Sequence, residues 1–322
     1  MLDLFIEAIV LIACGLGVGV LASMLGVGGG IILVPVLIIA FGLSASTAPG
    51  TTLVAALFVA MASLIPYYRQ RPRPIIPKAG LLLAITSVPG SLIGVWLREI
   101  VSDEETLRLM FAAILMPIAL KMLFTKKRGK ADATSEVGSF DLSGVSQARI
   151  GYSLIGSLCA GILSGLLGIG GGVLMVPVLN MMMGLPMHAA VATSMLTMVF
   201  TATSGTVMNY LAGQIHVFYA LTISLGMVAG AQFGPGLACK INAVRLKQLF
   251  GVLLVLPLVQ MARLGQLWLD PSGADFVRVT IGNTIIWLAI VVPVAVYRTV
   301  QSRRGTRPDG LSPEKCDLPT PE

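Results

Sequence analysis

The chain has 322 residues, of which 56% are hydrophobic and 11% charged, and its mean hydropathy is +0.89. Because soluble proteins carry about 25% charged residues, this composition excludes an ordinary soluble domain and indicates a protein that crosses a membrane several times. The net charge of +7 comes from Lys and Arg in short loops beside apolar segments, which indicates cytoplasmic loops and no nucleic-acid partner.

Apolar segments that approach the length of a membrane-spanning helix, roughly 20 residues, follow one another along the chain. In the first half they cover residues 4–25, 30–43, 47–66, 77–97 and 105–124. In the second half they cover residues 149–167, 172–185, 189–211, 217–239 and 244–264, and one more follows at 276–297. We therefore predict an all-α polytopic membrane protein with two homologous halves. Its parts are a first transmembrane repeat at 1–124, a cytoplasmic linker at 125–148, a second repeat at 149–265, an additional transmembrane segment at 266–297 and a polar cytoplasmic tail at 298–322.

A glycine motif occurs once in each half. Gly-Val-Gly-Gly-Gly at 26–30, followed by Val-Pro-Val-Leu, returns 142 residues later at 168–172, and 10 of 18 aligned residues are identical between 26–43 and 168–185. Each glycine inside a helix costs about 1 kcal/mol relative to alanine. We interpret the motifs as helix breaks that face each other across a substrate site, with Pro35 and Pro177 marking bends. Close packing of helices through small residues is the alternative.

Charges in the loops predict that the two halves are inverted. The loop 67–78 carries four basic residues and is expected in the cytoplasm, whereas the loop 98–108 carries four acidic residues and is expected outside. In the second half the matching loops have the opposite bias, since 213–216 has no Lys or Arg and 240–247 has three basic residues. An odd number of crossings per half would explain this. The segments 30–43 and 172–185, about 21 Å of helix each, are short for a full crossing, and the argument fails if they do not cross.

Hydroxyl side chains follow each glycine motif. Thr51 and Thr52 align with Thr193 and Ser194 at the same offset of 142. Neutral donors suit an oxyanion that must bind and leave again, and exposed N–H groups at a helix start attract anions. Asn209 is the only amide deep in its segment. The predicted substrate-binding residues are Gly26, Gly28, Gly29, Gly30, Thr51, Thr52, Gly168, Gly170, Gly171, Gly172, Thr193, Ser194 and Asn209.

The sequence contains no pattern typical of catalysis or of cofactor binding. It has no nucleotide-binding P-loop, no acidic metal cluster and no Ser/His/acid trio, and its four cysteines are isolated. We therefore predict no enzymatic activity, no cofactor and no metal. The expected partners are a small anion and membrane lipid, and a homodimer is left open.

The repeated G-[VI]-G-G-G motif, the V-P-V-L run and the Thr-Thr/Thr-Ser pair resemble the TauE/SafE family of anion transporters over about residues 5 to 265. Ala-Gly-Gln at 212–214 and Gly230 through Gly234 are also similar to that family. The resemblance implies secondary transport of a sulfur-containing or organic anion, such as sulfite, thiosulfate, sulfoacetate or another organosulfonate, in a bacterial inner membrane. The alternatives are an anion channel of the same architecture, an intramembrane enzyme and a non-transporting scaffold. The anion, its direction and the coupling ion stay open.

Overall fold

The computed structural model describes residues 2–44, 46–71, 73–100 and 146–241, together with 246, 248–252 and 282. Regular structure in these residues is entirely helical, which confirms the all-α prediction. The described residues up to Ile241 belong to one compact unit, and the others belong to a second. The predicted segment 105–124, the tail, most of the linker and nearly all of 276–297 lie outside the described residues.

The first unit contains a similar succession of helices in each half. The first half has α1 (Leu2–Leu25), α2 (Gly30–Phe41), α3 (Thr47–Arg69) and α4 (Pro77–Ile100). The second half has α6 (Gln147–Leu167), α7 (Gly172–Pro177), the π-helix η2 (Val178–Met182), α8 (Met187–Leu211), α9 (Val217–Ala231) and α10 (Gly234–Cys239). Six helical segments, with α9 and α10 taken as one, are long and apolar enough to cross a membrane. The chain is therefore a multi-pass membrane protein.

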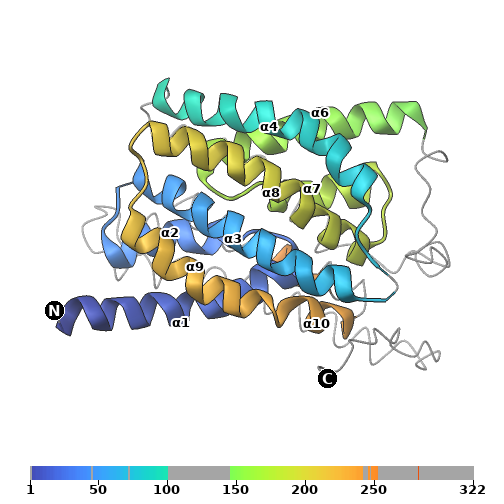
Figure 1. Cartoon of the computed structure of the whole chain (residues 1–322). Coiled ribbons are helices and arrows are strands. Elements are labelled where there is room, and N and C mark those ends of the chain that lie inside the picture. The colour runs from blue at the N-terminus through green and yellow to red at the C-terminus, as the bar shows by residue number, and fades with distance from the viewer. Residues whose placement is uncertain are drawn as a thin grey trace. The chain divides into compact units, whose positions relative to one another are not determined.

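The short segment of each half does not cross the bundle. Helix α2 has 12 residues, about 18 Å of helix, and it returns to the end of the bundle at which α1 begins (Figure 1). Helix α7 with η2 has 11 residues and likewise returns to the end at which α6 begins. Each pair is thus a re-entrant hairpin, so these segments cannot supply the crossing that the charge argument counted.

Equivalent helices of the two halves nevertheless run in opposite directions (Figure 1). Helices α1 and α3 start at the end of the bundle marked N, whereas α6 and α8 start at the opposite end. An odd number of crossings in the first half then needs one more crossing after α4, and the predicted segment 105–124 falls there, outside the described residues.

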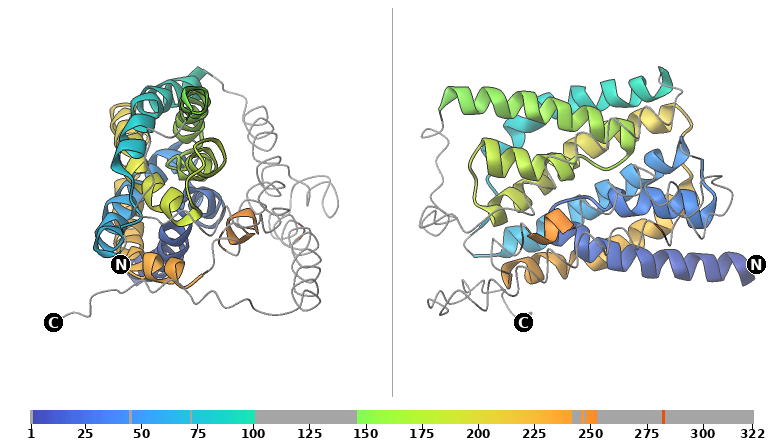
Figure 2. Two further views of the ribbon diagram at one scale, coloured as in Figure 1. Left: turned by 90° about the vertical axis from the view of Figure 1, so that its right-hand side faces the viewer. Right: turned by 180° about the vertical axis from the view of Figure 1, so that it is seen from behind.

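The fourth long helix of each half packs on the other half. Helix α4 lies mainly against α6 and α8, and α9 lies mainly against α1 and α3 (Figure 2). Glycines allow these close approaches, because a Cβ on Gly90 would stand 2.5 Å from the Leu158 carbonyl oxygen, and one on Gly230 within 3.0 Å of the Leu16 carbonyl oxygen. Small residues let helix backbones approach in this way inside membranes. The exchange interlocks the two halves.

Candidate functional site

The two glycine segments, 26–30 and 168–172, have the same backbone conformation. The first, third and fourth glycine of each lie in the left-handed region, with φ between 70° and 82°. Residues with a side chain rarely adopt this region, because Cβ collides with the backbone. Each segment therefore ends one helix and starts the next only because it consists of glycine at these positions.

The segments touch each other through reciprocal contacts between their ends. A Cβ on Gly30 would stand within 3.0 Å of the carbonyl oxygen of Gly168, and one on Gly172 within 3.0 Å of the carbonyl oxygen of Gly26. Adding 142 to one residue of the first pair and subtracting it from the other gives the second pair. The predicted facing of the two motifs is thus an observed contact, with a local twofold relationship.

Thr52 and Ser194 connect the helices that follow to this crossing. The Thr52 hydroxyl donates to the Gly168 carbonyl at 2.8 Å, and the Ser194 hydroxyl donates to the Gly26 carbonyl at 3.2 Å. Each hydroxyl also lies within hydrogen-bond distance of a carbonyl of its own helix, Pro49 at 3.0 Å and Val191 at 2.7 Å. In this conformation the protons of both side chains are directed at backbone oxygens.

Thr51 and Thr193 are one residue further from the crossing and hold loops instead. The N–H of His216, just before α9, donates to the Thr51 hydroxyl at 3.0 Å, and the N–H of Ile76, just before α4, donates to the Thr193 hydroxyl at 3.1 Å. The pair therefore fixes the starts of the two exchanged helices.

The structure does not bring Asn209 to the crossing. Its amide donates to the Gly205 carbonyl at 2.6 Å, and its oxygen accepts a hydrogen bond from Arg98, which also donates to Gln214. Asn209 lies 11 residues after Met198, about 16 Å along α8. It belongs to a polar contact between α4 and α8 at one end of the bundle.

The prolines have different surroundings from those expected of helix breaks. Helix α2 continues through Pro35 to Phe41, and Pro177 is the last residue of α7, after which the chain forms the π-helix η2. The reversals of direction occur at the glycines, several residues earlier. Pro177 marks a change of helix type, because it offers no N–H to the α-helical ladder.

The crossing lies at the middle of two long helices. A Cβ on Gly28 would stand 2.5 Å from the Met198 sulfur, and one on Gly170 would stand 2.8 Å from the Ala56 Cβ. Met198 is the twelfth of the 25 residues of α8, and Ala56 is the tenth of the 23 residues of α3. Since both helices are candidate membrane spans, the crossing is at the depth where transporters bind their substrates.

Backbone N–H groups are the donors that this crossing leaves unpaired. In the described part of the chain, no acceptor is found for the N–H groups of residues 28–31 and 170–173, all of which are buried. The three atoms nearest to each motif glycine belong to uncharged residues. Buried unpaired N–H groups are costly, so the arrangement can bind an anion through neutral donors. The described ranges contain no group of His, Cys, Asp and Glu that could hold a metal ion.

Ser164 and Met198 at the crossing were not among the predicted site residues. Met198 corresponds to Ala56 at the offset of 142, and Ser164, which faces Gly171, corresponds to Ala22. Each is a polar or bulky residue whose equivalent is alanine. The mismatch between the halves is the signal in the sequence that could have identified both.

Comparisons with known proteins agree with this architecture. The model of the family described as sulfite exporter TauE/SafE matches residues 11–261. The probable membrane transporter protein YunE of Bacillus subtilis is 29% identical over 253 residues, which cover 73% of this chain and 88% of that protein. A probable membrane transporter protein of Methanocaldococcus jannaschii is 28% identical over 254 residues, which cover 74% and 88%. No solved structure matches significantly.

Proposed function

Because this chain belongs to the sulfite exporter TauE/SafE family and is a membrane transporter, we propose that it is a secondary transporter of a sulfur-containing or organic anion in a bacterial inner membrane. Sulfite, thiosulfate, sulfoacetate and other organosulfonates are the candidate substrates. Transport proceeds by alternating access around the crossing of the glycine segments.

The observation that carries the proposal is the reciprocal crossing of segments 26–30 and 168–172 at the middle of the spans. Its unpaired N–H groups supply positive partial charge where no cationic side chain is close. Neutral donors bind an anion without the strong Coulomb attraction of a buried Lys or Arg, which would slow release. In the proposed site, Thr52 and Ser194 position the glycine carbonyls, and the glycine N–H groups contact the substrate.

The two re-entrant hairpins support an alternating-access mechanism. Helix α2 leaves the crossing toward one end of the bundle, and α7 leaves it toward the opposite end (Figure 1). Rocking of the halves would open the path along one hairpin while the other stays closed, as in other transporters with inverted repeats. A membrane potential that is negative inside favours export of an anion by about 2.3 kcal/mol per charge at 100 mV, so export needs no coupling ion.

Counterflow in proteoliposomes tests this function. Purified protein is reconstituted with unlabelled sulfite, thiosulfate, sulfoacetate, sulfate or chloride inside, and entry of a labelled sulfur anion is followed against liposomes without protein. Saturable entry that depends on one sulfur anion inside, and is absent with chloride, is the expected result. Flux that does not saturate would identify a channel. No flux with any of these anions, from protein that remains folded, would overturn the proposal.

A further inference from the structure

The surroundings of the two glycine segments differ at one residue. At seven of the eight motif glycines, an added Cβ would stand within 3.0 Å of another atom. At Gly171 the nearest atom is 3.4 Å away, which is ordinary van der Waals distance. Gly29, the equivalent of Gly171, is crowded by Met227 Cε at 2.5 Å and Val18 Cγ1 at 2.9 Å. The second half therefore has room where the first half is filled.

The residues at equivalent positions explain this difference. Val18 corresponds to Ala160 at the offset of 142. Between α4 and α9 the offset is 140, because the contact of Gly90 with Leu158 corresponds to that of Gly230 with Leu16, and Met227 therefore corresponds to Ser87. Two large side chains beside Gly29 are thus replaced by two small ones in the other half.

The room beside Gly171 is lined by a buried hydroxyl that has no partner. Ser164 Oγ is the atom 3.4 Å from the Cβ position of Gly171, Ser164 is 1% exposed, and its Oγ has no hydrogen-bond partner in the described part of the chain. Serines in membrane helices ordinarily bond to a carbonyl of their own helix, as Ser194 does. A buried hydroxyl that makes no such bond indicates a partner that arrives from outside the protein.

The methyl group of Thr201 lies 3.8 Å from the same Cβ position, because the Thr201 hydroxyl donates to the Thr197 carbonyl at 2.8 Å. The neighbourhood of Gly171 therefore combines one free hydroxyl donor, one methyl group and the unpaired N–H groups of 170–173. In the first half the residues equivalent to Ser164 and Thr201 are Ala22 and Val59, so no hydroxyl is available there.

We propose that the anion binds in the second half, beside Gly171, where the Ser164 hydroxyl and N–H groups of segment 170–173 donate to one oxyanion. This inference rests on the proposed transport function and adds the position of the site and the kind of ligand. The first half, with Met227 and Val18 against Gly29, forms a filled counterpart that binds no anion.

The size of the site selects a small inorganic oxyanion. The side chains of Ala160, Ser164, Thr201 and Ser87 together have three fewer heavy atoms than those of Val18, Ala22, Val59 and Met227. A space of that order accommodates an oxyanion such as sulfite and excludes a sulfonate that carries an aromatic ring. Inorganic sulfur oxyanions are therefore the substrate class, and organosulfonates are not.

The test uses full-length protein in proteoliposomes and measures the KM for labelled sulfite, together with stabilisation of the detergent-solubilised protein by sulfite. Ser164→Ala removes one hydrogen bond to a charged ligand, so the KM rises about tenfold or more, whereas thermal stability without sulfite is unchanged. Ala22→Ser, which adds a hydroxyl at the equivalent position, is the matched control and leaves the KM within about twofold.

A second pair of variants tests the room itself. Ser87→Met introduces the side chain that fills the first half, and abolishes both sulfite transport and stabilisation by sulfite. Met227→Ser is its control and retains transport. Wild-type transport of sulfite with an unchanged KM in Ser164→Ala, or with normal transport in Ser87→Met, would overturn the site. Stronger competition by toluenesulfonate than by sulfite would overturn the substrate class. Absence of counterflow in the wild type would instead refute the proposed function itself.

Discussion

The hydroxyl of Thr52 donates a 2.8 Å hydrogen bond to the carbonyl oxygen of Gly168, a residue 116 positions away in the other half of the chain. The same bond occurs in reverse from Ser194 to Gly26, 168 positions apart. Each half thus holds the glycine segment of the other half through one hydroxyl. Both donors are buried, so water does not compete for the carbonyls.

Replacement of these hydroxyls is expected to change stability and leave substrate affinity intact. Thr52→Val and Ser194→Ala each remove one hydrogen bond, which contributes about 1 kcal/mol to the free energy of unfolding. We expect a fall of a few degrees in the Tm of the detergent-solubilised protein and a sulfite KM within about twofold of the wild type. A large rise in KM with unchanged Tm would show instead that these hydroxyls donate to the substrate.

The contacts between the glycine segments predict which glycine accepts a methyl group. Gly30 and Gly172 begin helices with ordinary backbone angles, so alanine there introduces only the collision with Gly168 or Gly26. Gly30→Ala and Gly172→Ala should each lower stability by about 1–3 kcal/mol. Gly17, which is exposed and has nothing within 4 Å of its Cβ position, is the control, and Gly17→Ala should be neutral or stabilising. Equal Tm values for all three variants would contradict this packing.

The internal repeat made the hydroxyl pair and the glycine crossing predictable. The offset of 142 aligned Thr52 with Ser194 and segment 26–30 with 168–172 before any contact was known. The exchange of α4 and α9 could not be predicted, because it depends on contacts between residues far apart in the chain. It also follows a different offset, 140, since the loop before α9 is two residues shorter than the loop before α4.

The position of a polar residue along a helix was the part that the sequence concealed. Asn209 has the composition of a site residue, but its place near the end of α8 puts it beside Arg98. Ser164 resembles any serine of a membrane helix, and its unpaired hydroxyl becomes visible only when the side chains around Gly171 are known.

The exchange of α4 and α9 predicts that neither half folds alone. Without the second half, α4 loses the helices α6 and α8 on which it packs, and its apolar contact surface is left uncovered. Each half, expressed separately after a cut in the predicted linker 125–148, should aggregate in size-exclusion chromatography, and co-expression of both should restore a soluble detergent complex. A monodisperse, helical first half would show that the exchange does not contribute to folding.

The polar contact of Asn209 predicts a structural role at the end of the bundle. Asn209→Leu removes the oxygen that accepts from Arg98 and should lower the Tm, because a buried charged donor loses an acceptor. Asn209→Asp keeps an oxygen at that place and should retain stability. Since Asn209 lies about 16 Å from Met198 along α8, both variants should keep the sulfite KM. A raised KM in Asn209→Asp, with normal Tm, would return Asn209 to the substrate site.

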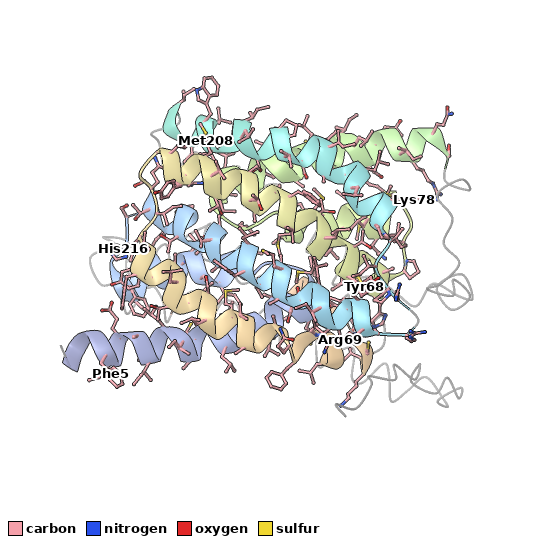
Figure 3. All side chains as sticks on the ribbon, viewed as in Figure 1. Phe5, Tyr68, Arg69, Lys78, Met208 and His216 are labelled. Carbon is pink, nitrogen blue, oxygen red and sulfur yellow. The ribbon has the colours of Figure 1, made fainter. Side chains whose placement is uncertain are left out.

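The distribution of charge predicts the orientation of the bundle in the membrane. Arg69 and Lys78 lie at one end, and Phe5 and His216 lie at the other (Figure 3). Cytoplasmic loops are enriched in Lys and Arg, so the end with the loop 67–78, which contains four basic residues, should face the cytoplasm. The re-entrant α2 would then return to the outer side and α7 to the inner side.

Cysteine labelling measures this orientation. In a variant whose four native cysteines are replaced, Ala212→Cys lies on the exposed end near His216, and Arg71→Cys lies in the exposed basic loop. A membrane-impermeant maleimide should label Ala212→Cys in intact spheroplasts and Arg71→Cys only after lysis. The reverse pattern would mean that the short loop before α9 is cytoplasmic. Because the proposed anion site lies beside Gly171 in the inner hairpin α6–α7, this measurement also decides from which side of the membrane that hairpin enters.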